Sequence, residues 1–162
     1  MCRVLLSRAV VILALLAPGA MLQVAGAEER AMKGMWAGNA KLTPTDDPDY
    51  VTNNETAVGE ATHLGKFAMT SVETVYVKYF PDFISVEGKF TMTSADGDKL
   101  FGTYCTTGGI NEEGSLDIIG TYRIVGGTGR FAGATGQGEL RAVAFLSEGL
   151  PFLGFMDGTI DY

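Results

Sequence analysis

The stretch FISVEGKFTMTSADGDKLFGTYCT, residues 83–106, decides the fold of this chain. Apolar and polar side chains alternate through its first half, and the apolar ones share a single face: Ile84, Val86, Phe90 and Met92. A period of two with one apolar face indicates a half-buried β-strand. The pair Asp96-Gly97 suits a tight hairpin turn, so residues 99–106 are expected to return as an antiparallel strand.

The same signals recur along the chain, in short runs rich in β-branched and aromatic residues that glycines and turn residues separate. Besides residues 83–94, strands are expected at 33–42, 56–62, 66–80, 99–106, 115–125, 135–146 and 152–162. In one of these strands a second apolar face is clear: Leu116, Ile118, Tyr122 and Ile124. The sequence thus predicts one all-β domain, a single antiparallel β-barrel of about eight strands. A closed barrel of that size is just filled by side chains or holds one small ligand.

Two segments are not expected to be strands. Residues 43–54 form a polar, acidic stretch that favours a solvated loop over a calcium site. A short turn of helix is expected near residues 130–134, and no other window shows a helical period.

The first residues have the pattern of a signal peptide. Two arginines precede an apolar run at residues 9–17, which is shorter than the roughly 20 residues that span a bilayer as a helix. Small residues at 25–27 then suit a signal peptidase. We expect residues 1–27 to be removed before Glu28, leaving a barrel domain over 28–162. The mature protein would be secreted or periplasmic, without membrane insertion after cleavage.

Charge and composition exclude several classes of partner. The chain has a formal net charge of −7, and the expected cleavage removes two arginines and no acid. Such a surface repels nucleic acid and anionic membranes. With one histidine and two cysteines, no metal site built on clusters of these residues is expected. No phosphate loop or dinucleotide fingerprint appears, so we expect no cofactor.

Residues 122–140 read YRIVGGTGRFAGATGQGEL, in which two strands meet at a corner formed by Gly126, Gly127, Gly129 and Phe131. This corner resembles the one shared by the allene oxide cyclase and dirigent barrels. Residues 62–67, THLGKF, resemble a phrase of uncharacterised exported bacterial members of this superfamily. The glycines are expected to supply backbone angles that other residues avoid, including a positive φ at Gly127. Phe131 is expected to plug one barrel end.

The resemblance implies a calycin-like barrel of eight antiparallel strands with an apolar interior, often assembled into homo-oligomers. It does not imply the cyclase active site. In those enzymes a glutamate on the first strand faces the cavity, whereas residues 33–42 contain no acid. The dirigent aspartates have no clear counterpart either. The one histidine, His63, is expected to be hydrogen-bonded at the barrel rim.

Two classes of function remain open. We favour a non-catalytic barrel that binds a small apolar ligand or serves as a structural or interaction module, because no acid, base or nucleophile constellation is visible. The alternative is an isomerase or cyclase that acts on a hydrophobic substrate, which an inward-facing carboxylate or Tyr104 would favour. The ligand is expected between the two apolar faces named above, where Gly88 and Gly120 interrupt the stripes and would leave space.

Overall fold

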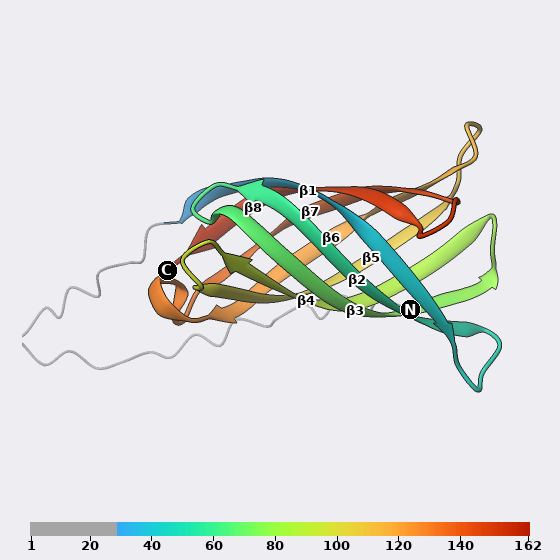
Figure 1. The fold of residues 1–162 in the computed structure, drawn as a ribbon, viewed down its shortest axis with the longest axis horizontal. Coiled ribbons are helices and arrows are strands. Elements are labelled where there is room, and N and C mark those ends of the chain that lie inside the picture. The colour runs from blue at the N-terminus through green and yellow to red at the C-terminus, as the bar shows by residue number, and fades with distance from the viewer. Residues whose placement is uncertain (1–28) are drawn as a thin grey trace, which may run out of the picture.

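The computed structural model describes residues 29–162, which form a closed barrel of eight antiparallel strands (Figure 1). The predicted signal peptide, up to its cleavage point before Glu28, lies outside the described residues. The strands are β1 (Arg30–Pro44), β2 (Tyr50–Ala61), β3 (Gly65–Tyr79), β4 (Phe83–Ser94), β5 (Lys99–Ile110), β6 (Ser115–Gly127), β7 (Thr135–Phe145) and β8 (Pro151–Asp161). The predicted all-β barrel is confirmed. Within residues 29–162, no helix is long and apolar enough to cross a membrane.

Each strand pairs with its neighbour in sequence, and β8 returns to pair with β1, so the barrel has no free edge. Alternate residues of every strand face inward, as the burial pattern of β4 illustrates over its whole length. Among residues 29–162 the one helical element is the short 3-10 turn η1 (Gly129–Phe131), close to the expected position. The fold is therefore a meander whose strands are joined by short turns.

The expected polar loop at residues 43–54 is largely wrong. β1 continues to Pro44 and β2 begins at Tyr50, so the two strands remain paired from Gly34↔Ala61 to Pro44↔Val51. Polar residues such as Asn54 and Thr56 lie on the exposed face, where water satisfies their side chains. The polar residues of this stretch mark the side of the strands that faces solvent. They do not indicate that a strand ends.

Inward-facing glycines are matched with aromatic rings on neighbouring strands. A Cβ added at Gly154 would collide with the ring of Trp36, which lies directly opposite on β1, and one at Gly102 would collide with Phe90. At Gly138 and Gly158 an added Cβ would lie 2.7 Å from Tyr122. Rings folded over glycines cover the backbone of strongly coiled strands and fill the barrel.

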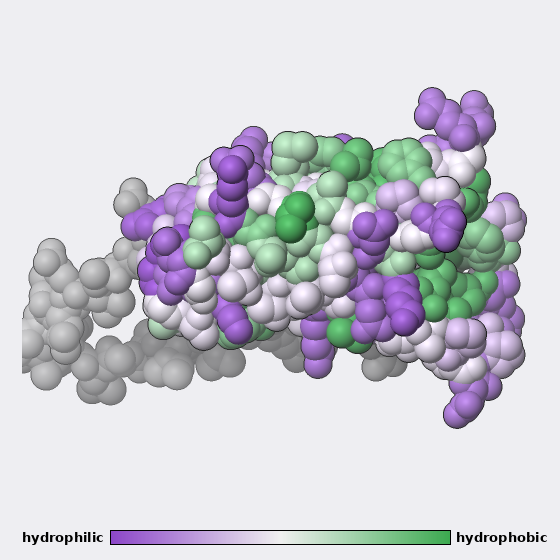
Figure 2. Space-filling view, in the orientation of Figure 1, coloured by the Kyte–Doolittle hydropathy of each residue, from purple (hydrophilic) through white to green (hydrophobic). Residues whose placement is uncertain are grey.

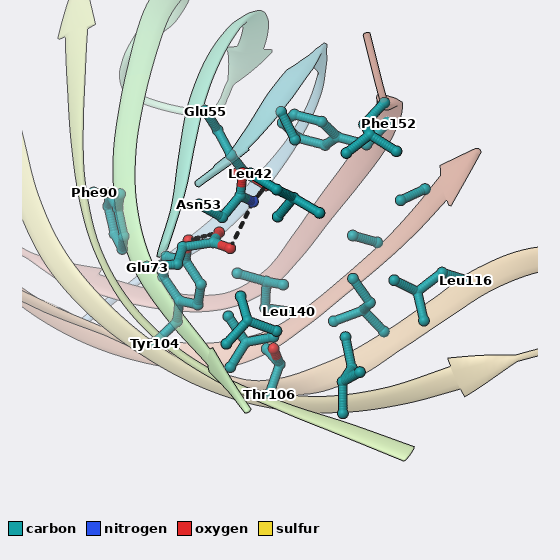
Figure 3. Close-up of a pocket in the computed structure, with 18 of the residues that line it drawn as sticks. Leu42, Asn53, Glu55, Glu73, Phe90, Tyr104, Thr106, Leu116, Leu140 and Phe152 are labelled. Atoms are coloured by element: carbon teal, nitrogen blue, oxygen red, sulfur yellow. Dashed lines mark hydrogen bonds between the residues drawn. The ribbon is translucent and has the colours of Figure 1, made fainter. Parts of the chain in front are cut away.

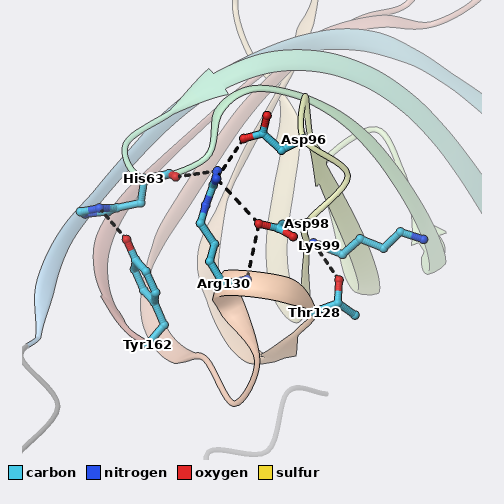
Figure 4. A network of polar contacts seen from close by, with 7 residues as sticks. All are labelled: His63, Asp96, Asp98, Lys99, Thr128, Arg130 and Tyr162. Atoms are coloured by element: carbon cyan, nitrogen blue, oxygen red, sulfur yellow. Dashed lines mark hydrogen bonds and ion pairs between the residues drawn. The ribbon is translucent and has the colours of Figure 1, made fainter.

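One end of the barrel is sealed by the segment between β6 and β7 (Figure 4). Phe131 is fully buried there, and its ring packs edge-on against Tyr162 with the ring centroids 5.0 Å apart. Arg130 lies over the outside of the Phe131 ring, pairs with Asp96 at 3.0 Å and donates to the carbonyl oxygen of His63. The corner thereby ties together the turns that precede β3, β5 and β7.

The glycines of the corner serve different purposes. Gly129 has a φ of +59°, in the left-handed region, so the expectation of a positive φ holds there. It is wrong for Gly127, whose φ is not positive. A Cβ at Gly127 would instead lie 2.6 Å from the carbonyl oxygen of Phe131 and 2.7 Å from its Cβ. Gly127 is therefore fixed by close packing against the plug residue.

His63 belongs to the same end of the barrel. Its Nε2 lies 3.0 Å from the carbonyl oxygen of Ala31 and must donate to it, so Nδ1 accepts a hydrogen bond from the hydroxyl of Tyr162 at 3.2 Å. Both ring nitrogens are used, and His63 has a φ of +67°. The geometry gives His63 a structural place at the rim, with both ring nitrogens engaged in hydrogen bonds.

We predict that Phe131→Ala lowers the free energy of unfolding by about 3–5 kcal/mol, because it empties a fully buried site between rigid turns. Phe83→Ala is the matched control, since Phe83 is 40% exposed on the opposite end of the barrel, and it should cost less than about 1 kcal/mol. Chemical denaturation of both variants measures the difference. Equal losses would show that Phe131 is not the plug of the closed end.

Candidate functional site

The other end of the barrel is open and leads into a cavity of about 380 Å³. Its mouth is rimmed by Leu42, Phe80, Leu146 and Leu150, and Figure 2 shows hydrophobic residues gathered at this right-hand end. The walls are almost entirely apolar (Figure 3). Volume and lining fall in the range typical of small-molecule sites.

Six of the eight residues predicted to line a ligand cavity do face this space: Ile84, Val86, Phe90, Met92, Leu116 and Ile118. The other two, Tyr122 and Ile124, also point inward but lie in the packed core at the closed end. That core fills the half of the barrel beyond Trp36, so the cavity occupies only the half near the mouth. Whether the six residues contact a ligand stays a prediction.

A cluster of polar side chains lies in the cavity wall, on β2, β3 and β5 (Figure 3). The amide nitrogen of Asn53 donates to Glu73 Oε2 at 2.9 Å and to Glu55 Oε1 at 3.2 Å. Ser71 Oγ donates to Glu55 Oε2 at 2.9 Å, and the hydroxyl of Tyr104 donates to Glu73 Oε1. Two carboxyl groups thus share one set of donors inside an apolar chamber.

Strand register places these groups side by side. Asn53 lies opposite Glu73 and Glu55 lies opposite Ser71 in the β2–β3 ladder. Glu73 in turn lies opposite Gly88 on β4, and Gly88 lies opposite Tyr104 on β5. Because Gly88 has no side chain, the Tyr104 ring can cross β4 and reach Glu73.

The expectation that Gly88 and Gly120 leave space for a ligand is wrong. A Cβ at Gly88 would lie 2.6 Å from the Tyr104 hydroxyl oxygen, so the ring already fills that position. At Gly120 an added Cβ would lie 2.6 Å from the Cα of Thr106 and also meet the carbonyl oxygen of Cys105. Gly120 therefore permits close backbone approach. The cavity arises instead from small residues higher in the wall, such as Ala40, Ala142 and Ala144.

Burial sets the protonation of the cluster. Desolvation first, and then the negative charge of Glu73, raises the pKa of Glu55 from the usual 4.5 to about 8. At neutral pH Glu55 therefore holds a proton beside Glu73. Burial and the same carboxyl groups raise the pKa of Tyr104 as well, so its hydroxyl remains a donor. The site carries a proton that can be given up near neutral pH.

The sequence interpretation missed Glu55, Glu73 and Asn53. Asn53 and Glu55 precede residue 56, where the strand was expected to start. Neither could therefore be assigned to the inward or the outward side of a strand. Glu73 had a usable signal, because in β3 it shares its parity with Phe67, Met69, Val75 and Val77, all apolar. A glutamate at an inward position of an apolar stripe indicates either a buried structural network or a site.

Comparison of the chain with protein-family models, curated proteins and solved structures finds no match. The resemblance to the allene oxide cyclase and dirigent barrels therefore stays a prediction, as does assembly into homo-oligomers. The chemistry of the cavity carries the functional proposal.

We predict that stability falls as the pH rises from about 4.5 to 8, by at most about 1.4 kcal/mol per pH unit from Glu55. Between these values the folded chain holds a proton on Glu55 that the unfolded chain releases. The contribution is complete below 4.5 and is lost as Glu55 ionises in the folded state.

Chemical denaturation at several pH values measures this dependence. Glu55→Gln, which resembles the protonated carboxyl, should flatten the slope in this window. Glu60→Gln is the control, because Glu60 is exposed on the same strand. A slope that Glu55→Gln leaves unchanged would contradict the assignment of the proton to Glu55.

Proposed function

We propose that the protein binds a small amphipathic molecule inside the open half of the barrel. The observation that carries the proposal is the combination of an apolar chamber of about 380 Å³ with one polar cluster in its wall. An apolar chamber binds hydrocarbon by removing it from water, and a single polar cluster fixes the orientation of the ligand. The ligand's apolar body would lie among Ile84, Val86 and Leu116, with its polar group toward Glu73.

A purely structural barrel would have little reason to keep this arrangement. Buried carboxyl groups are costly unless they are fully hydrogen-bonded. Here Asn53 Oδ1 and Thr106 Oγ1, both beside the cavity, are buried without a hydrogen-bond partner among the described residues. Unsatisfied polar atoms around an apolar chamber support a site that is completed by a ligand.

Filling the chamber tests the proposal. We expect a neutral, environment-sensitive apolar dye to bind the mature protein, and Ala142→Phe to weaken this binding at least tenfold, because Ala142 lines the cavity. Val143→Phe is the matched control, since the next residue on β7 points outward and does not line the cavity. Fluorescence titration measures all three proteins. Absence of dye binding, or equal binding by Ala142→Phe, would refute the proposal.

We also propose an alternative, an isomerase or cyclase acting on a hydrophobic substrate in the same cavity. The observation in its favour is a protonated Glu55 beside Glu73, since one group can donate a proton and the other can accept one. In this alternative the hydroxyl of Tyr104 would stabilise, by a hydrogen bond, the negative charge that develops on the substrate.

For this activity we expect the protein to exchange the α-hydrogens of hydrophobic ketones for solvent deuterium. Glu73→Gln should slow the exchange by about 10²–10⁴-fold. Mass spectrometry of the recovered ketone measures the exchange. Exchange no faster than in buffer would dismiss the enzymatic alternative while leaving ligand binding in place.

A further inference from the structure

The cavity contains negative charge and no positive charge. Of the described residues that line it, Glu55 and Glu73 are the only acidic ones, and none is a lysine, arginine or histidine. The basic groups nearest to the mouth point elsewhere: Lys78, for example, pairs with Asp49 at 2.9 Å on the outside of the barrel. With one proton on the pair, the cluster keeps a net negative charge that no side chain of the cavity wall neutralises.

Hydrogen-bond capacity is equally one-sided. The donors of the cluster are consumed, because both the amide of Asn53 and the hydroxyls of Ser71 and Tyr104 already point at carboxyl oxygens. What remains on the wall is mainly acceptor capacity: Asn53 Oδ1, which has no partner, and the free lone pairs of the two carboxyl groups. Among the described residues, the one unpartnered hydroxyl on the wall, that of Thr106, can donate a single hydrogen bond. The amide nitrogen of Asn53 lies near an oxygen of each carboxyl group, and the charged Glu73 favours this orientation over one that would turn the amide oxygen toward it.

These two properties select the polar group of the ligand. A carboxylate would be repelled by the pair and would find few donors. A neutral alcohol could donate one hydrogen bond but would leave the negative charge uncompensated. An ammonium group brings three donors and one positive charge, and in a water-poor chamber such a charge-assisted pair is stronger than a neutral one.

Charge outside the cavity acts in the same direction. The formal net charge of the chain is −7, so its field attracts cations and slows the approach of anions. The apolar rim of Leu42, Phe80 and Leu146 would then take up the hydrocarbon part once the cation has entered.

We propose that the molecule bound in this barrel is an amphipathic amine, with its ammonium group between Glu55 and Glu73 and its apolar body directed toward the mouth. This inference rests on the proposed function, because it names the chemical class of the ligand for the same cavity. It distinguishes the barrel from carriers of fatty acids, whose charged group has the opposite sign.

The test uses three probes that share one hydrocarbon chain and differ only in the head group: decylamine, decanol and decanoate. Each is titrated, below the concentration at which it aggregates, against the mature protein holding the neutral dye, at pH 7. We expect decylamine to displace the dye at a concentration at least tenfold lower than decanol, and decanoate to be the weakest. The double substitution Glu55→Gln/Glu73→Gln should bring the amine-to-alcohol ratio to within about twofold of unity. Glu60→Gln, exposed on the same strand as Glu55, should leave the ratio unchanged.

The outcomes separate the two proposals. If decanol or decanoate binds as well as decylamine, the amine assignment is overturned while the ligand-binding function stands. If the parent protein prefers the amine and the double variant keeps that preference, the ammonium group lies elsewhere and the assignment also fails. If neither the dye nor any probe binds, the proposed function itself fails. Should the double variant not fold, the ratio measured on the parent protein still decides whether the amine is preferred.

Discussion

Closing eight strongly coiled strands into a small barrel is the constraint on which the rest of this structure depends. Side chains from all strands converge on one axis, and there is not enough room for a large residue at every inward position. The chain resolves the conflict by alternating aromatic residues with glycines on adjacent strands, so that Trp36 lies over Gly154 and Phe90 over Gly102. Each ring occupies the volume that its neighbour's missing side chain leaves open.

The two ends of the barrel differ because this filling is uneven. Toward the closed end, buried methionine, leucine and aromatic side chains form one core cluster with Phe131, which is completely buried. Toward the mouth, inward positions of β1 and β7 carry alanines, among them Ala40, Ala142 and Ala144, which leave the cavity open. Stability therefore resides mainly at one end, and the opposite end is free to bind.

Tyr104 links the packing rule to the candidate site. Its ring packs over Gly88, in the same way that Trp36 packs over Gly154. In addition, its hydroxyl donates a hydrogen bond to Glu73 and so fixes the position of that carboxyl group. Replacing either partner would disturb both the wall and the site. The buried pair of Glu55 and Glu73 costs stability as the pH rises, because the second negative charge has no compensation. Natural chains retain such groups where function needs them more often than where folding does.

The sequence by itself determined the barrel. Period-two alternation, turn residues and the absence of a helical period specify eight antiparallel strands, because side-chain direction along a strand is a local property of the backbone. For β4 the expected bounds were those observed. All four of its predicted inward residues line the cavity, and so do two of the four predicted for β6. Local pattern failed at residues 43–54, where a polar strand face looks like a loop. It also wrongly predicted empty space at Gly88 and Gly120, because what fills the space beside a glycine comes from the neighbouring strand.

Tertiary structure alone decided the site. Asn53, Glu55, Glu73 and Tyr104 come from three strands, and their contacts depend on the register of three ladders and on the glycine that lies between Glu73 and Tyr104. Register over such distances is set when the whole barrel closes, and no window of sequence contains it. The raised pKa of Glu55 has the same origin, since burial and the nearby charge exist only once the strands have come together.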